Sequence, residues 1–224
     1  KHKTSGTLKM LTFAKQIFGW CLNRREIFIH RINIFTFKMM DIALPKDNEE
    51  EFISIALRLG IKKLRFLYPF DKYQNQKSRI FDFDVEIGFI VNQKNMNEVS
   101  KQSGFLAVKS SDKDRFFIES KKIRMIYGFE ESYERDYLHQ RKSGLNHVIC
   151  ELARKNDIII GFSYGSLLEN DLAASSLLMG RVMQNIALCQ KYKVRTMIGC
   201  FSEKAFSLRS PHDVKSLFAL MGMK

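Results

Sequence analysis

The chain has 224 residues, of which 45% are hydrophobic and 12% aromatic, with only 3 proline and 12 glycine residues. Such a composition can bury a core, and it excludes collagen-like and disordered proteins. The 37 basic and 24 acidic residues give a formal net charge of +13, so a polyanion such as nucleic acid is the first expected partner.

The positive charge is concentrated at the N-terminus. Residues 1–40 contain eight Lys and Arg residues and one acidic residue, Glu26, a net charge of +7 that leaves +6 for residues 41–224. The segment lacks the Ser-rich composition and the amphipathic period of a transit peptide. We expect one main domain over residues 40–224 that begins at Met39 or Met40. Residues 1–39 are then a basic extension, translated from upstream sequence and not native to the domain.

Neither a membrane span nor a disulfide framework is expected. Lys15, Arg24, Arg25 and Arg31 interrupt the N-terminal apolar runs before they reach the roughly 18 uncharged residues that a span requires. The four cysteines form no C-x-x-C pair, which favours reduced thiols in a reducing compartment.

From residue 41 onward, short runs rich in Ile, Val, Phe and Leu alternate with stretches of helical period. This pattern predicts a parallel sheet covered by helices, and we expect a barrel rather than an open sheet. The seven predicted strands are residues 41–44, 62–68, 85–91, 105–109, 124–127, 157–162 and 195–200.

Capping residues mark the predicted helices. Asn48 with Glu51 predicts a capping box, and Gly60 stands where that helix would end. A second helix has Leu145, Val148, Ile149 and Leu152 on its apolar face. A long helix follows Asp171, with Leu178, Val182, Ile186 and Cys189 inside, and the last begins with Ser210 as cap and Pro211 at its first position. Residues 71–84 are expected to be a long connection, and residues 128–142 fit no class.

The catalytic motifs of barrel and α/β enzymes are missing or incomplete. No two histidines form H-x-H, and the first predicted strand ends in Ala43, Leu44 and Pro45 rather than in metal ligands. Gly161 to Gly165 match the letters of G-x-S-x-G around Ser163, but we expect no strong helix directly after them and no triad partners, so a nucleophilic Ser163 is disfavoured.

Polar residues in the last third of the chain are the candidates for binding. Arg181 and Asn185 share one helix face, beside but not on the apolar stripe. Lys191 and Lys193 follow at the helix end, where they can either contact a partner or simply complement the helix dipole.

Arg209 precedes the Ser210 cap, where a cation faces the positive end of the helix dipole. An anion shared with the free N–H groups of that helix would relieve this conflict. Pairing of Arg209 with Asp213 is the structural alternative, and both interpretations stay open.

Three ordered blocks then show a resemblance. Residues 141–168, 179–194 and 207–223 together resemble the p30-type protein subunit of archaeal and eukaryotic ribonuclease P, called protein component 3 in archaea. The residues that match the family pattern are Asn146, Phe162-Ser163, Arg181, Asn185, Leu208-Arg209-Ser210-Pro211 and Asp213.

The resemblance implies a small TIM-like (β/α) barrel and a subunit that is not itself catalytic. In that holoenzyme the catalytic RNA, using magnesium, removes the 5′ leader from precursor tRNA. The implied partners are the ribonuclease P RNA, a ferredoxin-like protein subunit called component 2, the other ribonuclease P proteins and, indirectly, precursor tRNA. No cofactor is expected on this chain, and the location would be cytoplasmic in an archaeon or nucleolar in a eukaryote.

The sequence therefore predicts a ribonuclease P subunit. Its RNA- or partner-binding residues are predicted to be Asn146, Arg181, Asn185, Lys191, Lys193, Arg209 and Ser210. A metal-dependent phosphoesterase of the related barrel superfamily is the alternative, and a generic basic scaffold is a third possibility. The Lys- and Ile-rich body suggests an archaeal source.

Overall fold

The computed structural model describes residues 40–72, 80–99, 104–131, 136, 138–139 and 141–224. The expectation about residues 1–39 and the thiol of Cys21 lie outside the described residues. The other three cysteines, Cys150, Cys189 and Cys200, are free and buried.

Seven parallel strands run in sequence order from β1 to β7. They are β1 (Asp41–Ala43), β2 (Leu64–Pro69), β3 (Val85–Ile90), β4 (Phe105–Lys109), β5 (Met125–Tyr127), β6 (Ile159–Ser163) and β7 (Thr196–Gly199). All seven predicted strands are present, because short apolar runs that alternate with helices are typical of the buried strands of a parallel sheet. The TIM-like barrel prediction is confirmed.

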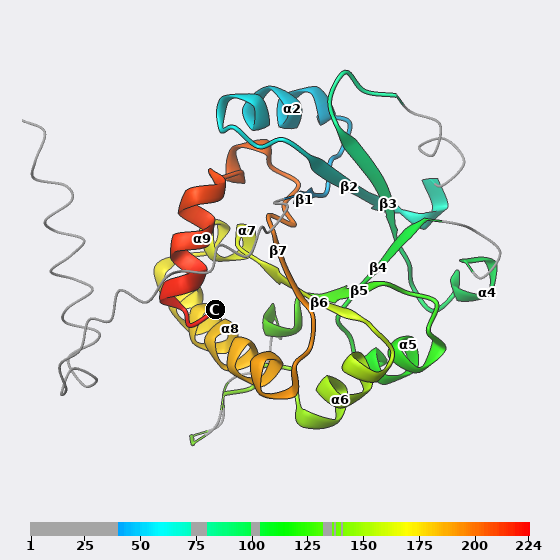
Figure 1. The fold of residues 1–224 in the computed structure, drawn as a ribbon, viewed down its shortest axis with the longest axis vertical. Coiled ribbons are helices and arrows are strands. Elements are labelled where there is room, and N and C mark those ends of the chain that lie inside the picture. Colours follow the sequence, from blue (N-terminus) through cyan, green and yellow to red (C-terminus); the bar gives the residue numbers. More distant parts are fainter. Residues whose placement is uncertain (1–39, 73–79, 100–103, 132–135, 137, 140) are drawn as a thin grey trace, which may run out of the picture. The chain divides into compact units, whose positions relative to one another are not determined.

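Helices connect the strands and cover their outer face (Figure 1). They are α2 (Glu49–Arg58), α4 (Met96–Val99), α5 (Asp114–Ser120), α6 (His147–Lys155), α7 (Gly165–Glu169), α8 (Leu172–Tyr192) and α9 (Pro211–Leu220). Short 3-10 turns η1 (Phe70–Lys72), η2 (Phe129–Glu131) and η3 (Ala205–Ser207) lie at strand ends and before α9.

A seam between β1 and β7 nearly closes the barrel. The Phe201 N–H donates to the Ile42 carbonyl (2.8 Å) and the Leu44 N–H to the Ser202 carbonyl (2.9 Å). The Asp41 carboxylate adds a bridge, because it accepts the Cys200 N–H (2.8 Å) and the Tyr164 hydroxyl. The first strand is therefore fixed to the last by two backbone hydrogen bonds and by the half-buried side chain of Asp41.

Two apolar clusters fill the molecule. One lies between the strands and the helices, and the other lies inside the barrel, with Ile42, Leu67, Met125 and Tyr127 among its members. At the N-terminal end of the strands, Arg65 closes the interior: it pairs with Glu86, and its guanidinium lies 3.6 Å from the centre of the Phe105 ring.

The capping-box prediction at Asn48 is wrong, because its side chain caps no helix N–H. Instead the amide accepts the Lys46 N–H (2.9 Å) and donates to the Glu203 carbonyl (3.1 Å), so a tertiary contact replaces the local cap. Gly60 does follow the end of α2 at a φ of 69°.

The predicted apolar face of α6 is only partly right. Val148 is 40% exposed, whereas Cys150 and Ala153 are fully buried. The predicted inner face of α8 is confirmed, and so are its Asp171 cap and the Ser210 cap of α9.

Candidate functional site

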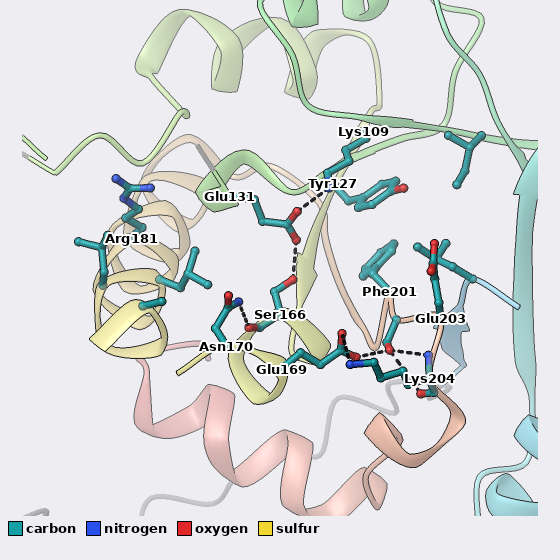
Figure 2. A pocket seen from close by; sticks show the side chains of 16 residues that line it. Lys109, Tyr127, Glu131, Ser166, Glu169, Asn170, Arg181, Phe201, Glu203 and Lys204 are labelled. Carbon is teal, nitrogen blue, oxygen red and sulfur yellow. Dashed lines mark hydrogen bonds and ion pairs between the residues drawn. The ribbon is translucent and has the colours of Figure 1, made fainter. Parts of the chain in front are cut away.

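A cavity of about 870 Å³ opens at the C-terminal ends of the strands (Figure 2). Lys109 and Tyr127 come from the ends of β4 and β5, and Ser166, Glu169 and Phe201 come from the segments that follow β6 and β7. Barrel proteins gather their reactive and binding groups at this end. We call this cavity the mouth and treat it as the first candidate site.

Two stacked aromatic rings lie on the inner side of the mouth. The ring centres of Tyr127 and Phe201 are 4.5 Å apart, with an interplanar angle of 12°. Phe201 has a left-handed backbone with a φ of 48°, which is uncommon for a bulky residue. This conformation places its ring in the apolar cluster inside the barrel, so the interior below the mouth is packed rather than open.

Each carboxylate in the mouth already has a partner from the chain. Glu131 pairs with Lys109 (2.8 Å) and accepts the Ser166 hydroxyl (2.5 Å). Glu169 accepts hydrogen bonds from the hydroxyls of Ser202 and Ser207, and its Oε2 lies 4.0 Å from the Lys204 Nζ. Glu203 pairs with Lys46 (2.7 Å). The acidic and basic side chains of the mouth thus neutralise one another, and the mouth has no excess of positive charge to attract a polyanion.

Glu130 lies beneath the mouth and is 1% exposed. Its Oε1 accepts a 3.4 Å hydrogen bond from the Ser163 N–H, and its Oε2 has no hydrogen-bond partner among the described residues. Burial raises the pKa of Glu130 to about 7, because the charged form loses its hydration. Glu130 is therefore largely protonated below neutral pH.

Ser163 is enclosed and engaged in structural hydrogen bonds. Its hydroxyl donates to the Cys200 carbonyl (3.1 Å) and accepts the Ser166 N–H (3.1 Å), and the residue is 0% exposed. A helix, α7, does begin at Gly165, but it has only five residues and no side-chain cap, which agrees with the expectation that no strong helix follows directly. A Cβ at Gly165 would lie 2.3 Å from the Cys200 carbonyl oxygen, so glycine permits this close start.

Arg181 and Asn185 lie on the buried face of α8, not beside it. Arg181 is 1% exposed; it donates to Asp136 (2.9 Å from Nε) and to the Glu130 carbonyl (3.1 Å). Burial opposes ionisation of Asp136, but hydrogen bonds from the Lys142 N–H and Arg181 outweigh it, and the pKa of Asp136 falls below its usual value. In this structure Arg181 holds the segment after β5 against α8.

Asn185 makes a similar contact one turn further along α8. Its amide donates to the Ser143 carbonyl (2.9 Å), and its Oδ1 has no hydrogen-bond partner among the described residues. The sequence pattern left both polar residues without a structural role. The structure supplies one, because Arg181 holds Asp136 and the Glu130 carbonyl, and Asn185 holds the Ser143 carbonyl, against α8.

Asn146 and Ser210 both cap helices. The Asn146 side chain accepts the Ile149 N–H (2.9 Å) at the start of α6, and the Ser210 hydroxyl accepts the Asp213 N–H (3.2 Å) at the start of α9. These contacts account for both residues within the fold, and a binding role for them remains a prediction.

Lys191, Lys193 and Arg209 are the exposed members of the predicted site. Arg209 does not pair with Asp213: its guanidinium donates to the carbonyls of Phe206 and Leu208 (both 2.8 Å), which relieves the unfavourable position before the helix. Lys191 and Lys193 lie at the C-terminal end of α8, whereas Arg209 lies just before the N-terminal end of α9. The seven predicted residues therefore do not form one site.

Among the residues that line the mouth, Arg181 was predicted from the sequence as a binding residue, whereas Lys109, Glu131, Ser166 and Glu203 were not. Lys109 ends a strand, and Glu131, Ser166 and Glu203 follow strands within a few positions. Position after a strand is the signal that could have identified them, because the C-terminal ends of parallel strands meet at one end of a barrel. Within the described part of the chain, no three His, Cys, Asp or Glu residues are grouped as metal ligands.

No protein-family model matches the chain. Among curated proteins, it is 19% identical over 196 residues to ribonuclease P protein component 3 of Methanothermobacter thermautotrophicus, covering 80% of this chain and 77% of that one. It is 25% identical over 183 residues to the protein of the same name from Methanococcus maripaludis, covering 78% and 69%. Over 82 residues, 37% of this chain and 34% of the relative, it is 32% identical to the Methanococcoides burtonii protein of that name.

The predicted resemblance to the p30-type ribonuclease P subunit is confirmed. A chain in the cryo-EM structure of archaeal ribonuclease P with mature tRNA shares the fold, with a TM-score of 0.65 and 17% identity over 83% of each chain. The similarity extends beyond the three sequence blocks, since the first two component 3 relatives match about four fifths of the chain.

Proposed function

We propose that this chain is a protein subunit of ribonuclease P that supports the catalytic RNA in removing the 5′ leader from precursor tRNA. The observation that carries the proposal is the similarity to component 3 proteins over about four fifths of the chain. The reaction belongs to the RNA with its magnesium, and this chain contributes to the tRNA-processing endoribonuclease as a non-catalytic part. The proposed location is the cytoplasm of an archaeal cell.

The internal pairing of the mouth fits this role. A barrel hydrolase needs unpaired carboxylates, metal ligands or an activated nucleophile where its strands end. Here Glu131, Glu169 and Glu203 are each held by a lysine or a serine, and Ser163 is buried. The alternative, a metal-dependent phosphoesterase, has no supporting ligand set among the described residues.

The outer face of α8 is a suitable surface for the ferredoxin-like protein partner. Leu172, Met179 and Met183 are 89%, 37% and 36% exposed, and from Leu172 to Gln190 the only charged residue is Arg181, which is buried. By length and composition α8 could even cross a membrane, but its inner face packs into the barrel core. An exposed apolar surface on such a helix is typical of a protein–protein contact.

Reconstitution tests the proposed function directly. Ribonuclease P RNA and the other protein subunits are assembled with and without the full chain, and cleavage of precursor tRNA is followed. We expect omission to lower the cleavage rate at moderate magnesium concentration, and added chain to restore it. Equal rates with and without the chain would refute the proposal, and so would leader removal by the chain alone.

A further inference from the structure

Almost all unbalanced positive charge of the barrel lies at the end opposite to the mouth. The chain there includes the helix ends and loops that lead into β5, β6 and β7, namely residues 121–124, 154–158 and 191–195, which we call the basal segments. They contain eight Lys and Arg residues and one acidic residue, a net charge of +7. Residues 41–224 have a net charge of +6 in all, so the residues of this range outside the basal segments have a net charge of −1.

The three basal segments are neighbours in space. Helices α5, α6 and α8 pack side by side (Figure 1). Because they lead into the parallel strands β5, β6 and β7, they end at the same end of the barrel. The segments are also joined by backbone bonds, since the Ile159 N–H donates to the Arg124 carbonyl (2.9 Å) and the Ile160 N–H to the Arg195 carbonyl (2.9 Å). The eight cations, distant in sequence, therefore share one surface.

Most of these cations have no carboxylate partner. All eight are exposed. The one acidic residue, Asp157, pairs with Arg195 (2.8 Å) and Arg124 (3.9 Å). Within the described part of the chain, the other six form no ion pair; they are Lys121, Lys122, Arg154, Lys155, Lys191 and Lys193. This is the reverse of the mouth, where lysines and glutamates neutralise each other.

Two of these lysines occupy positions that suit other residues better. Lys121 and Lys193 directly follow α5 and α8 with left-handed backbones, at φ values of 56° and 54°. Glycine or asparagine adopts this conformation more easily. A single cation in the last turn is enough to complement a helix dipole. The dipole therefore does not explain why lysine occupies both left-handed positions in addition to Lys122, Lys155 and Lys191.

The surface suits phosphates in water rather than a membrane. Ile123, Ile158 and Val194 of the basal segments are buried, and Tyr192 is half-buried against the core, so these segments have no fully exposed apolar side chain to anchor in a lipid surface. Lysines on flexible stems contact a phosphate backbone as point charges and do not distinguish bases.

We infer that the basal segments bind the phosphate backbone of the ribonuclease P RNA, at the end of the barrel opposite to the mouth. This inference rests on the proposed function and adds the location of the RNA contact. Lys191 and Lys193, predicted from sequence, belong to this surface. Arg209, at the start of α9, does not.

The test compares two triple variants of the full chain with equal loss of charge. The basal variant is Lys121→Asn, Lys155→Gln and Lys193→Asn. The control is Lys46→Gln, Lys94→Gln and Lys113→Gln, whose lysines all follow strands and so lie at the mouth end. Binding to ribonuclease P RNA is measured between about 50 and 400 mM salt, because each phosphate contact adds about 0.7–0.9 to the slope of log affinity against log salt.

We expect the basal variant to bind about tenfold more weakly near 150 mM salt and to reduce that slope by about two, while the control matches the unmodified chain. Thermal unfolding should show no loss of stability in the basal variant, because asparagine suits both left-handed positions. Equal losses in both variants, or a loss in the control alone, would overturn the inference.

Two further readouts separate this inference from other outcomes. If the basal variant keeps its RNA affinity but no longer associates with the protein partner in the absence of RNA, the surface binds an acidic protein and the inference is wrong. If the unmodified chain fails to stimulate the reconstituted enzyme, the proposed function fails. If it stimulates and only the location is refuted, the proposed function stands.

Discussion

Glu130 shows how one buried group couples the fold to pH. The carboxyl group is enclosed beneath the mouth with one oxygen unpartnered, and its pKa is raised to about 7. A raised carboxyl pKa means that folding favours the protonated form. The corresponding stability is fully present below the unfolded pKa near 4.5 and is lost as the pH rises through about 7.

Glu130→Gln removes this titration. Relative to the unmodified chain, the free energy of unfolding of the variant should increase by up to about 3 kcal/mol between pH 4 and pH 8. Denaturant unfolding at both pH values gives the comparison, and the exposed Glu50→Gln serves as control. A difference that does not change with pH would contradict the assignment of the titration to Glu130.

Substitution of Arg209 distinguishes a role in binding from a role in folding more clearly than substitution of the buried Arg181, because the Arg209 side chain is exposed. Arg209→Ala removes two hydrogen bonds to the Phe206 and Leu208 carbonyls, so we expect the free energy of unfolding to change by less than about 1 kcal/mol. If Arg209 binds RNA or a partner, as the sequence predicts, activity of the reconstituted enzyme should fall, most at raised salt. Unchanged activity across a salt series would remove Arg209 from the site.

At the scale of elements, α8 combines two functions on opposite faces. The inner face supplies Leu178, Val182 and Ile186 to the core together with the polar contacts of Arg181 and Asn185. The outer face has small and apolar residues without charge. Gly180 lies where the segment before α6 meets α8: a Cβ there would lie 2.7 Å from Arg141 Nε, so the glycine allows the arginine to lie close to the helix.

Met179→Asp with Met183→Asp tests the outer face of α8. Both side chains are over one third exposed, so the variant should fold with a melting temperature within a few degrees of the unmodified chain. Affinity for the ferredoxin-like subunit should fall at least about tenfold, because charge is placed in an apolar contact. Calorimetric titration measures the loss. The control is Leu220→Asp on α9, 77% exposed, and an equal loss there would contradict the assignment.

The sequence predicted the elements better than the site. Seven short apolar runs, rich in Ile, Val, Phe and Leu, with helical segments between them were sufficient to predict a parallel barrel. Helix α5 was missed because it has seven residues and no side-chain cap at Lys113, and α7 because it begins at a glycine without a loop. Val148 was misplaced because α6 buries Cys150 and Ala153, small residues that the periodic pattern did not include.

The site could not be predicted fully because binding surfaces combine residues that are distant in sequence. Arg181 and Asn185 were assigned to binding since nothing in the local pattern gives them partners, and their partners lie about forty residues earlier. The basal segments were within reach of the sequence: each precedes a predicted strand, and residues that precede parallel strands share one end of a barrel. Only the structure shows which of these lysines form ion pairs and which do not.

At the scale of the whole molecule, the seam between β1 and β7 nearly closes the barrel by joining its first and last strands. The Asp41 carboxylate contacts the Cys200 N–H and the Tyr164 hydroxyl, and that hydroxyl oxygen also lies 3.4 Å from the Arg209 N–H. One side chain on the first strand thus links the last strand, the segment after β6 and the start of α9. Loss of this carboxylate should loosen the seam without changing the ladders on the far side.

Asp41→Ala should therefore lower the free energy of unfolding by about 2–3 kcal/mol, since the Ile42 N–H, the Cys200 N–H and the Tyr164 hydroxyl all lose their acceptor on Asp41. Hydrogen exchange should accelerate at the Cys200 and Phe201 amides, which lie on the seam. It should change less at the Val91 amide, which donates to the Ala107 carbonyl on the other side of the barrel. If all three amides accelerate equally, the variant is unfolding globally and the seam is no weaker than the rest of the sheet.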